Sequence, residues 1–312
     1  MIELLRAGPL TTVQDLGRMG WRDHGLSLCG ALDDLALQRG NLLVGNAPGT
    51  AGLEFTLGPA TLRFHADACI ALTGTDADAS LDGRPLRPWW RAAVRAGQTL
   101  RLAAPRERMR SYLAIGGGLA LPPALGSLST DLKAGFGGLD GRALRDGDRL
   151  PLTLIDPPTA PPARAIGLHA PDWDASVRVL PGPEHDEFSA AAREAFWSAG
   201  WTLTPQSNRM GYRFAGPGLQ RERGGELASH GVLPGVVQVP PSGQPIVLLA
   251  DAQTTGGYPK IGVVIRADLW KLAQLRLGAA LRFIPCGLDE ARDALRQRQA
   301  QLDQLRSALR DR

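Results

Sequence analysis

The chain has 312 residues, of which 44% are hydrophobic and 21% are charged, so it can bury a sizeable core and is not globally disordered. The 35 Lys and Arg residues are nearly balanced by 31 Asp and Glu residues, and no long basic run occurs, so we expect no nucleic-acid-binding surface. No apolar run reaches the roughly 18 residues that a membrane helix needs. We therefore expect a cytoplasmic protein with no membrane span.

Residues 1–154 are predicted to form an N-terminal β-barrel-like half. A helix is predicted from Asp33 to Leu43, where Asp33 or Asp34 supplies the N-cap. Short apolar segments between glycines and prolines are predicted as strands: Ile2–Leu5, Ala60–Phe64, Ala68–Leu72, Thr99–Leu102 and Tyr112–Ile115.

Residues 155–165 carry four prolines and are predicted to be a linker, because proline stiffens an extended chain and cannot donate to a sheet. Residues 166–287 are then predicted to form a second strand-rich half. Helical segments are predicted at Ser189–Ala199 and Asp268–Leu275. The predicted strands are Val177–Leu180, Gly235–Val239, Ile246–Leu249 and Ile261–Ile265. The fold is thus predicted to be mainly β with a few helices, in two barrel-like or sandwich-like halves.

The tail, residues 288–312, is predicted to be an amphipathic helix. Leucine recurs every seven residues at Leu288, Leu295, Leu302 and Leu309. Such a short repeat does not demand a coiled-coil partner, so we expect the leucine stripe to be buried on the protein itself.

The densest polar run follows the predicted strand Ile246–Leu249. It brings a carboxylate, a carboxamide, two hydroxyls, two glycines and a phenol into one short segment, Asp251–Pro259. Paired glycines let backbone N–H groups approach a ligand, and a glutamine both donates and accepts hydrogen bonds, which suits an amide-type substrate. A polar turn without a ligand is the alternative interpretation.

Two further runs contain arginine among small polar residues. In Ser207–Arg213, Arg209 has the fork-shaped donor group that binds carboxylate or phosphate. In Thr12–Arg18, Asp15 and Arg18 either belong to a site or simply pair with each other. The sequence contains no phosphate-binding loop, no nucleophile elbow and no Cys/His cluster, so we expect no metal site.

Taken together, these runs resemble one family: the C subunit of 5-oxoprolinase, also called allophanate hydrolase subunit 2, Kip antagonist or the carboxyltransferase part of urea carboxylase. The resemblance covers about residues 10 to 285 and is carried by segments in one order. They are T-V-Q-D-L-G-R (Thr12–Arg18), G-A-L-D (Gly30–Asp33), N-L-L-V-G-N (Asn41–Asn46), L-E-F-T-L-G-P (Leu53–Pro59), L-G-S-L-S-T (Leu125–Thr130), S-N-R-M-G-Y-R (Ser207–Arg213), V-Q-V-P-P-S-G-Q-P-I (Val237–Ile246) and D-A-Q-T-T-G-G-Y-P-K-I (Asp251–Ile261).

The resemblance implies two cyclophilin-like β-barrel halves and a heteromeric complex. The implied partners are a smaller B subunit, which is similar to allophanate hydrolase subunit 1, and an amide hydrolase that forms the A subunit. That complex hydrolyses 5-oxoproline to L-glutamate with ATP and Mg²⁺, which act at the level of the complex. No lysine lies in a biotin-attachment context, so we expect no covalently attached biotin.

The same resemblance implies the site residues. Arg209 would clamp a carboxylate or phosphoryl group and Asp251 would act as base or orienter. Arg209 and Gln253 are expected to line one pocket, where substitution costs little stability. The substrate-binding set is Gln14, Asp15, Arg18, Asn208, Tyr212, Gln253, Thr254, Thr255, Gly256, Gly257 and Tyr258.

Two other functions fit the same family. The chain is either a carboxyltransferase-like protein of the urea carboxylase or allophanate hydrolase type, served by biotin carried elsewhere, or a non-enzymatic regulator that antagonises a kinase inhibitor. Genes for the A and B subunits beside this one would favour the oxoprolinase, and a biotin carboxylase gene would favour the carboxyltransferase.

Overall fold

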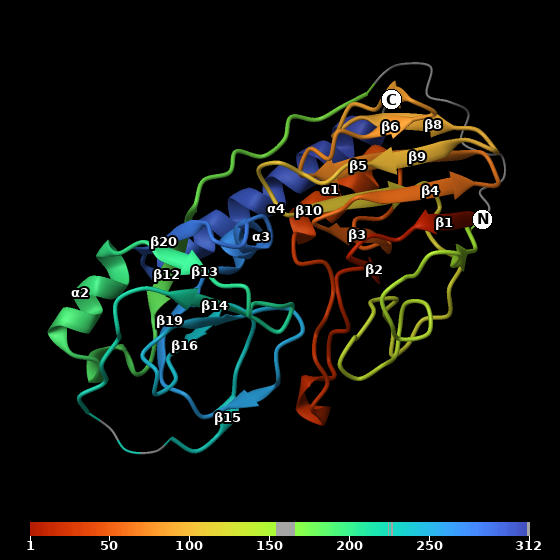
Figure 1. Ribbon diagram of the computed structural model, residues 1–312. Helices are drawn as coiled ribbons and strands as arrows, with labels where there is room; N and C mark the ends of the chain where they lie inside the picture. The colour runs from red at the N-terminus through yellow and green to blue at the C-terminus, as the bar shows by residue number, and fades with distance from the viewer. Residues whose placement is uncertain (154–165, 224, 226, 311–312) are drawn as a thin grey trace. The chain divides into compact units, whose positions relative to one another are not determined.

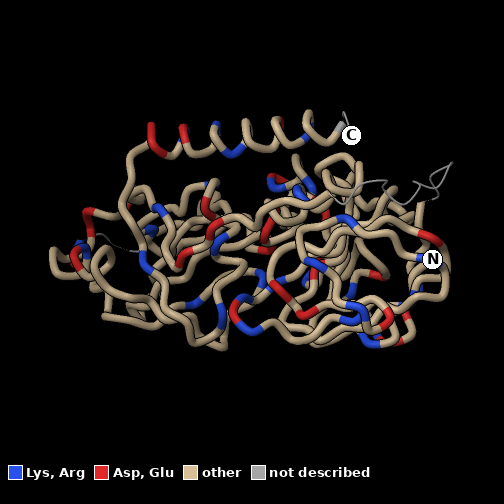
Figure 2. The backbone as a smooth tube through the Cα atoms, turned by 90° about the horizontal axis from the view of Figure 1, so that it is seen from above, with Lys and Arg blue, Asp and Glu red and all other residues tan. Residues whose placement is uncertain are grey.

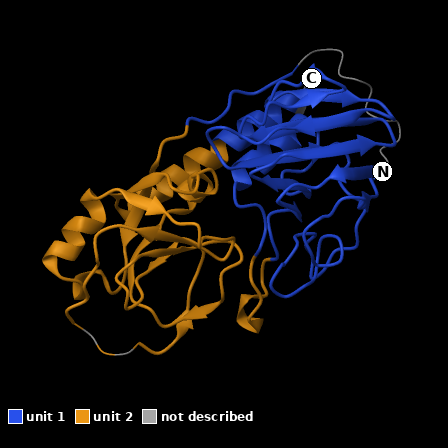
Figure 3. Cartoon of the chain, viewed as in Figure 1, with its two compact units in different colours: residues 1–18, 29–172, 301–312 blue, residues 19–28, 173–300 orange. Residues whose placement is uncertain are grey.

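The structure, a computed structural model, describes residues 1–153, 166–223, 225 and 227–310. It divides into two compact units (Figure 3). Unit 1 comprises Met1–Arg18, Cys29–Asp172 and Gln301–Arg312, and unit 2 comprises Met19–Leu28 and Trp173–Ala300. Each unit therefore contains segments that are far apart in the sequence. The linker predicted at residues 155–165 lies outside the described residues.

Unit 1 is built from two sheets whose neighbouring strands pair antiparallel (Figure 1). The first has the order β11 (Arg149–Leu150), β1 (Ile2–Arg6), β4 (Ala60–Phe64), β9 (Thr99–Leu102), β6 (Ser80–Leu81) and β7 (Arg84–Pro85). The second has the order β2 (Leu10–Gln14), β3 (Gly52–Thr56), β10 (Arg110–Ile115), β5 (Ala68–Gly74) and β8 (Arg91–Val94). Alternate apolar side chains of both sheets form one core, which includes Leu4, Leu53, Phe64, Leu100 and Leu113.

Helix α1 (Asp34–Leu43) of unit 1 begins where its sequence predicts. The Asp33 side chain accepts a hydrogen bond from the Ala36 N–H at 2.8 Å, which satisfies one of the helix's unpaired donors. Its buried face includes Ala36 and Leu37, which pack with Tyr112 of β10. The cap residue thus lies in the same buried region as the sheet that the helix covers.

Unit 2 is a closed barrel. Its strand order is β12 (Ser176–Pro181), β19 (Lys260–Val264), β16 (Val236–Gln238), β17 (Ile246–Leu248), β14 (Gly211–Ala215), β13 (Trp201–Leu203) and β20 (Ala280–Pro285). β12 and β20 pair in parallel, and the other neighbouring pairs are antiparallel. Two further strands, β15 (His230–Gly231) and β18 (Thr255–Gly256), pair with each other in a separate two-stranded sheet. In the sequence, β15 precedes β16 and β18 lies between β17 and β19.

Short helices complete unit 2. Helix α2 (Ala190–Ser198) is capped by Ser189, whose hydroxyl accepts from the Ala192 N–H at 3.0 Å, and its Phe196 stacks on Phe283 of β20 at 4.8 Å between ring centroids. The remaining short elements are α3 (Leu269–Ala273) and the 3₁₀ turns η1 (Arg22–His24), η2 (His185–Glu187) and η3 (Arg266–Asp268).

Helix α4 (Leu288–Arg310) contributes residues to both units. Asp289 and Glu290 occupy its first turn, where negative charges interact favourably with the helix dipole. Residues of both charge signs follow along the rest of the helix (Figure 2). In unit 2, Ala294 packs with Ile265 and Ala267, and in unit 1, Leu309 packs against a core that includes Leu43. No helix within the described ranges has the length and apolar character to span a bilayer.

The predicted mainly β fold with a C-terminal helix is confirmed. The barrel closes in unit 2, whereas the strands of unit 1 form two separate sheets. The leucine stripe of the tail is only partly buried, because Leu302 is 5% exposed but Leu288 is 54% and Leu295 is 45% exposed. The boundaries predicted for the two halves stay a prediction, and the compact units interleave in the sequence.

Candidate functional site

The candidate loop, Leu249–Pro259, continues β17 and is anchored by an apolar side chain at its start. Ala252 is fully buried and packs with Val232, Val236 and Leu248. Because Ala252 fills this position in the core, the residues on either side of it are held in place. The polar residues from Gln253 onward then continue the loop towards the surface, where Thr255 and Tyr258 are exposed.

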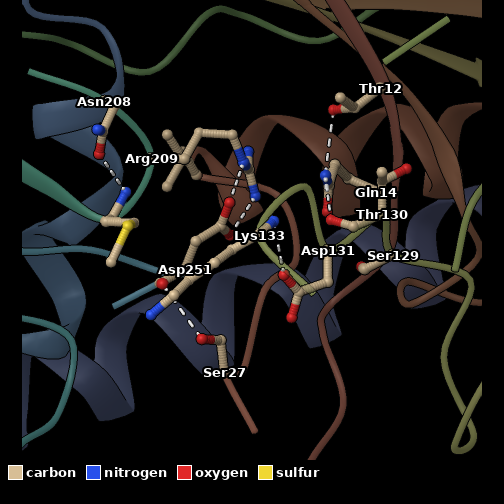
Figure 4. Close-up of polar contacts among 12 residues, drawn as sticks. Thr12, Gln14, Ser27, Ser129, Thr130, Asp131, Lys133, Asn208, Arg209 and Asp251 are labelled. Carbon is tan, nitrogen blue, oxygen red and sulfur yellow. Dashed lines mark hydrogen bonds and ion pairs between the residues drawn. The ribbon is translucent and has the colours of Figure 1, made fainter. Parts of the chain in front are cut away.

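A buried ion pair fixes the first residue of the loop's polar run. The Arg209 guanidinium donates from Nε to Asp251 Oδ2 at 2.8 Å and from Nη2 to Asp251 Oδ1 at 2.9 Å (Figure 4). Both side chains are almost completely buried, at 3% and 4% exposure. The Asp251 N–H also donates to the Arg209 carbonyl at 3.1 Å. This bidentate geometry makes the pair a strong positional constraint.

A strap from the N-terminal part of the sequence, residues 19–28, holds the same loop by its carbonyl groups. The Ser27 hydroxyl lies 3.2 Å from the Asp251 carbonyl (Figure 4) and 3.1 Å from the Ala252 carbonyl. Arg22 Nη2 donates to the Val232 carbonyl at 2.5 Å and the Gln253 carbonyl at 3.2 Å. Burial lowers the pKa of the Arg22 guanidinium from its usual value. The loop is thus tied down by residues remote in sequence.

A cavity of about 800 Å³ lies in unit 2 beside the loop. Its wall combines carboxamides, hydroxyls and backbone with apolar side chains. The described residues that line it are Phe188, Leu219, Gln220, Arg221, Gly225, Leu227, Ser229, Gln238, Val239, Pro240, Pro241, Gln253, Gly256, Gly257, Tyr258 and Pro259. An apolar hollow with a few polar groups is the usual form of a small-molecule site.

The charged side chain among these described lining residues is neutralised. Arg221 donates to Glu187 Oε2 from Nε at 2.8 Å and from Nη2 at 2.5 Å. The Gln253 side chain makes no hydrogen bond with other described residues, since only its main-chain carbonyl is engaged. Gln238 Nε2 is buried and has no hydrogen-bond partner in the described part of the chain. The wall therefore offers neutral donors and acceptors.

The predicted site residues of the second half divide into four groups. Gln253, Gly256, Gly257 and Tyr258 line the cavity. Arg209 and Asp251 are joined to each other, and Arg209 is not among the described residues that line the cavity beside Gln253. Thr254 and Thr255 lie in the same loop.

Asn208 and Tyr212 have local structural roles. Asn208 Oδ1 accepts from the Met210 N–H at 2.8 Å within its own turn. Tyr212 is buried on β14, at 1% exposure. Neither Asn208 nor Tyr212 belongs to the described residues that line the cavity.

The predicted residues of the first half lie in unit 1, where their side chains make hydrogen bonds to backbone groups of other segments. Gln14 Oε1 accepts from the Gly30 N–H at 3.1 Å, and Gln14 Nε2 lies 3.1 Å from the Thr12 hydroxyl (Figure 4). Asp15 accepts from the Ser127 hydroxyl at 2.7 Å and the Leu128 N–H at 2.6 Å. Arg18 donates to the Ser129 carbonyl at 2.5 Å and stacks on Phe136. Asp15 and Arg18 thus both contact Ser129, but the described contacts include no ion pair between them, which is the pair that the sequence allowed.

The sequence matches, over residues 24–285, the family model described as carboxyltransferase domain, subdomain A and B. The chain belongs to this carboxyltransferase-domain family. It is 51% identical to the 5-oxoprolinase C subunit of Escherichia coli over 305 residues, which are 98% of this chain and 97% of that protein. It is 45% identical to the 5-oxoprolinase C subunit of Haemophilus influenzae over 306 residues, 98% of each chain. The family resemblance read from the sequence motifs is confirmed.

The fold is also found in a larger protein. The crystal structure of the Kluyveromyces lactis urea amidolyase superposes with a TM-score of 0.90 at 28% sequence identity and covers 97% of this chain. This chain covers 20% of that protein, so it spans about one fifth of the urea amidolyase.

Sequence reasoning missed the contributions of Arg22, Ser27 and Gln238 to this region. Gln238 falls inside one of the motifs that identified the family, Val237–Ile246, which was a usable signal. Arg22 and Ser27 belong to no such motif, and their contacts bridge 231 and 224 positions of sequence.

Proposed function

We propose that this chain is the C subunit of an ATP-dependent 5-oxoprolinase, a complex that opens the lactam of 5-oxoproline to give L-glutamate. The observation that carries the proposal is the 51% identity to the 5-oxoprolinase C subunit of Escherichia coli, because the match covers 97% of that protein. A match of this extent supports transfer of the whole protein's role.

The proposed substrate site is the cavity beside the loop. A lactam presents one N–H donor and one carbonyl acceptor side by side, and a glutamine side chain presents the complementary pair. Gln253 has an unengaged side chain at the cavity wall, and Gly256 and Gly257 bring backbone to the same wall. In this proposal Thr254 and Thr255 extend the polar edge, and Tyr258 lies at the exposed rim.

The Arg209–Asp251 pair holds the loop in this proposal. Two guanidinium nitrogens already occupy the two carboxylate oxygens, so the pair fixes the loop's position and leaves substrate contact to the residues after it. We therefore assign both residues a positioning role in place of the clamp and base expected from the sequence.

ATP and Mg²⁺ act, in this proposal, at the level of the complex, whose other members are the smaller B subunit and the amide hydrolase that forms the A subunit. Within the described residues, no group of three or more His, Cys, Asp or Glu side chains is placed to hold a metal ion. Arg221 at the cavity is paired with Glu187. The described lining of the cavity thus presents no uncompensated positive charge to a nucleotide's phosphates, and we derive no phosphate-transfer step on this chain.

The test is reconstitution. The chain is purified with the A and B subunits of the same organism, and ATP-dependent release of glutamate from 5-oxoproline is measured. We expect activity when all three proteins are present and none when this chain is omitted or used alone. Full activity without this chain would overturn the proposal.

A second function, carboxyl transfer of the urea carboxylase type, is favoured by the family model and by the fold shared with the urea amidolyase. The same preparation distinguishes the two functions. Urea-dependent ATP turnover in the presence of a biotin carboxylase and a biotinylated carrier, without turnover of 5-oxoproline, would select the second.

A further inference from the structure

Strand β15 directs backbone hydrogen-bonding groups away from its only described neighbour, β18. Gly231 lies opposite Thr255, and the next residue, Val232, donates its N–H to the Thr254 carbonyl at 2.9 Å. Residues of an antiparallel pair alternate between those that exchange hydrogen bonds with the opposite residue and those that do not. Because Val232 makes such a bond, the N–H and C=O of Gly231 point to the outer edge of β15.

This outer edge is open to solvent. Gly231, Ser229 and His230 are all exposed. No hydrogen bond is described for the Gly231 N–H, and a Cβ atom on Gly231 would meet no described atom within 4 Å. Figure 1 shows β15 at the lower margin of unit 2. The strand therefore has a backbone donor and acceptor available for a further strand.

The sequence around β15 lacks the features that protect an exposed strand edge. Natural proteins guard such edges with charged side chains, above all lysine, or with proline. Residues 228–233 contain no Lys, Arg, Asp, Glu or Pro. They end on Leu233, a large apolar residue that is 61% exposed. Leu233 is two positions from Gly231, so in an extended chain both face the same side, where an added strand would place alternate side chains.

The edge also lies at the rim of the cavity. Ser229, which precedes β15, and Gly256 of β18 both line it. Neighbouring strands are about 5 Å apart, so side chains of a strand added to β15 would reach the cavity. The charged side chain among the described lining residues, Arg221, is paired with Glu187. An added strand is thus placed to bring the charged groups that this wall lacks.

We propose that β15 is the docking edge for an extended segment of a partner subunit, which adds a strand to this sheet and carries an apolar residue beside Leu233. In such contacts, main-chain hydrogen bonds give affinity and alternate side chains give specificity. That the partner belongs to an oxoprolinase complex rests on the proposed function, whereas the docking chemistry rests on the open edge.

The first experiment needs no variant. Amide hydrogen exchange at Gly231 is measured in the full-length wild-type chain, alone and after addition of the purified A and B subunits. We expect exchange at Gly231 to slow at least roughly tenfold in the complex, because its N–H then donates to the added strand. Unchanged exchange at Gly231 in a complex that has formed would overturn the inference.

Two substitutions of one residue test the backbone contact. Gly231→Pro removes the outward N–H but no bond between β15 and β18, because that N–H points away from β18. Gly231→Ala is the matched control, since it keeps the N–H. We expect the proline variant to bind the partner subunit at least roughly tenfold more weakly, the alanine variant to bind as wild type, and both to melt at the wild-type temperature. Wild-type affinity in Gly231→Pro would contradict the proposal.

A third substitution tests the apolar contact. Leu233→Ser should weaken binding of the partner subunit without lowering the melting temperature, because the side chain is already largely exposed. Leu277→Ser, at a leucine of the same unit that is 43% exposed, is its control and should bind as wild type. Equal affinity of the two serine variants would remove Leu233 from the contact.

Sedimentation of the chain alone tests the other occupant of the edge. We expect no self-association that depends on β15. A dimer that is present in the wild type and lost in Gly231→Pro would show that a second copy pairs with the edge, and would overturn the assignment to a partner subunit.

The outcomes also separate this inference from the proposed function. A complex that protects Gly231 but releases no glutamate from 5-oxoproline would reject the function and keep the docking edge. Oxoprolinase activity and subunit affinity that are both unchanged in Gly231→Pro would keep the function and reject the docking edge.

Discussion

Arg209 and Asp251 are a buried pair of opposite charges, so each stabilises the other in the interior. From sequence alone, substitution of a pocket arginine is expected to leave stability nearly unchanged, but the 3% exposure of Arg209 reverses that expectation. Arg209→Ala would remove the guanidinium that donates to both oxygens of the buried Asp251 carboxylate. Breaking such a pair by removing one partner costs about 3–5 kcal/mol.

The measurement is the free energy of unfolding in urea. Arg213→Ala, an exposed arginine on β14, is the control and should change it by less than about 0.5 kcal/mol. A variant with apolar residues at both positions 209 and 251 should recover much of the loss. A loss of less than about 1 kcal/mol in Arg209→Ala would contradict the burial argument.

Asp148 gives the stability of unit 1 a defined dependence on pH. Arg142 donates to both of its oxygens, at 2.7 and 2.9 Å, and this hydrogen bonding lowers the pKa of the Asp148 carboxyl below its usual value of 3.8. A lowered pKa adds stability above the unfolded-state value, and that stability is lost as the pH falls through the lower folded value.

We therefore expect Asp148→Asn to be less stable than wild type by about 1 kcal/mol at pH 7. The difference should shrink as the pH falls below about 3.8, because the wild type then loses the same interaction. Thermal melting of both proteins between about pH 7 and pH 2.5 tests this. A difference that stays constant over that range would show that charge is not the cause.

At the scale of single elements, α4 shows that helical spacing alone does not decide burial. Its less exposed positions are Ala291, Ala294, Arg298, Leu302, Leu305 and Leu309, separated by three or four residues. That spacing follows the roughly 3.6 residues of a helical turn. Leu288 and Leu295 continue the same three- and four-residue spacing, yet they are 54% and 45% exposed, so what each turn of the helix packs against decides which of these positions are covered.

The difference in exposure between Leu302 and Leu295 predicts that their substitution has unequal effects on stability. Leu302→Ala should cost about 2–4 kcal/mol, because the residue is 5% exposed and its removal leaves a cavity. Leu295→Ala, at 45% exposure, should change stability by less than about 0.5 kcal/mol. Urea unfolding of the two variants tests this, and equal losses would mean that the whole leucine stripe is covered in solution.

At the scale of the whole molecule, the strap of residues 19–28 makes the candidate loop depend on a distant part of the chain. Arg22→Ala removes donors to the Val232 and Gln253 carbonyls. The Val232 N–H, which donates to the Thr254 carbonyl at 2.9 Å, reports on the loop. Its hydrogen exchange should become roughly tenfold faster in Arg22→Ala, because local opening is easier once one constraint is lost.

His24→Ala on the same strap is the control, since His24 is exposed and its described side-chain contacts, with Asp23 and the Trp21 ring, stay within the strap itself. Its Val232 amide should exchange at the wild-type rate. The reconstituted complex should also lose activity with Arg22→Ala and keep it with His24→Ala. Equal exchange in the two variants would show that the strap does not hold the loop.

The sequence by itself determined the features whose causes are local. The N-caps Asp33 and Ser189 bond to N–H groups only three residues away, so residue type and spacing suffice to locate them. The strands at Ala60–Phe64 and Thr99–Leu102 have the bounds predicted from their apolar pattern. The ordered motifs also identified the family, and with it the cavity-lining residues Gln253, Gly256, Gly257 and Tyr258.

Only the tertiary structure decided which polar groups meet. Arg209 and Asp251 are 42 positions apart, and Ser27 reaches the loop across 224 positions, so no local pattern encodes these partners. Burial depends on the same long-range packing, which is why Arg209 proved to be covered and Gln238 to line a cavity. A sequence specifies side-chain chemistry directly, but the closure of the barrel fixes which of those side chains lose water and which keep a surface to offer a ligand.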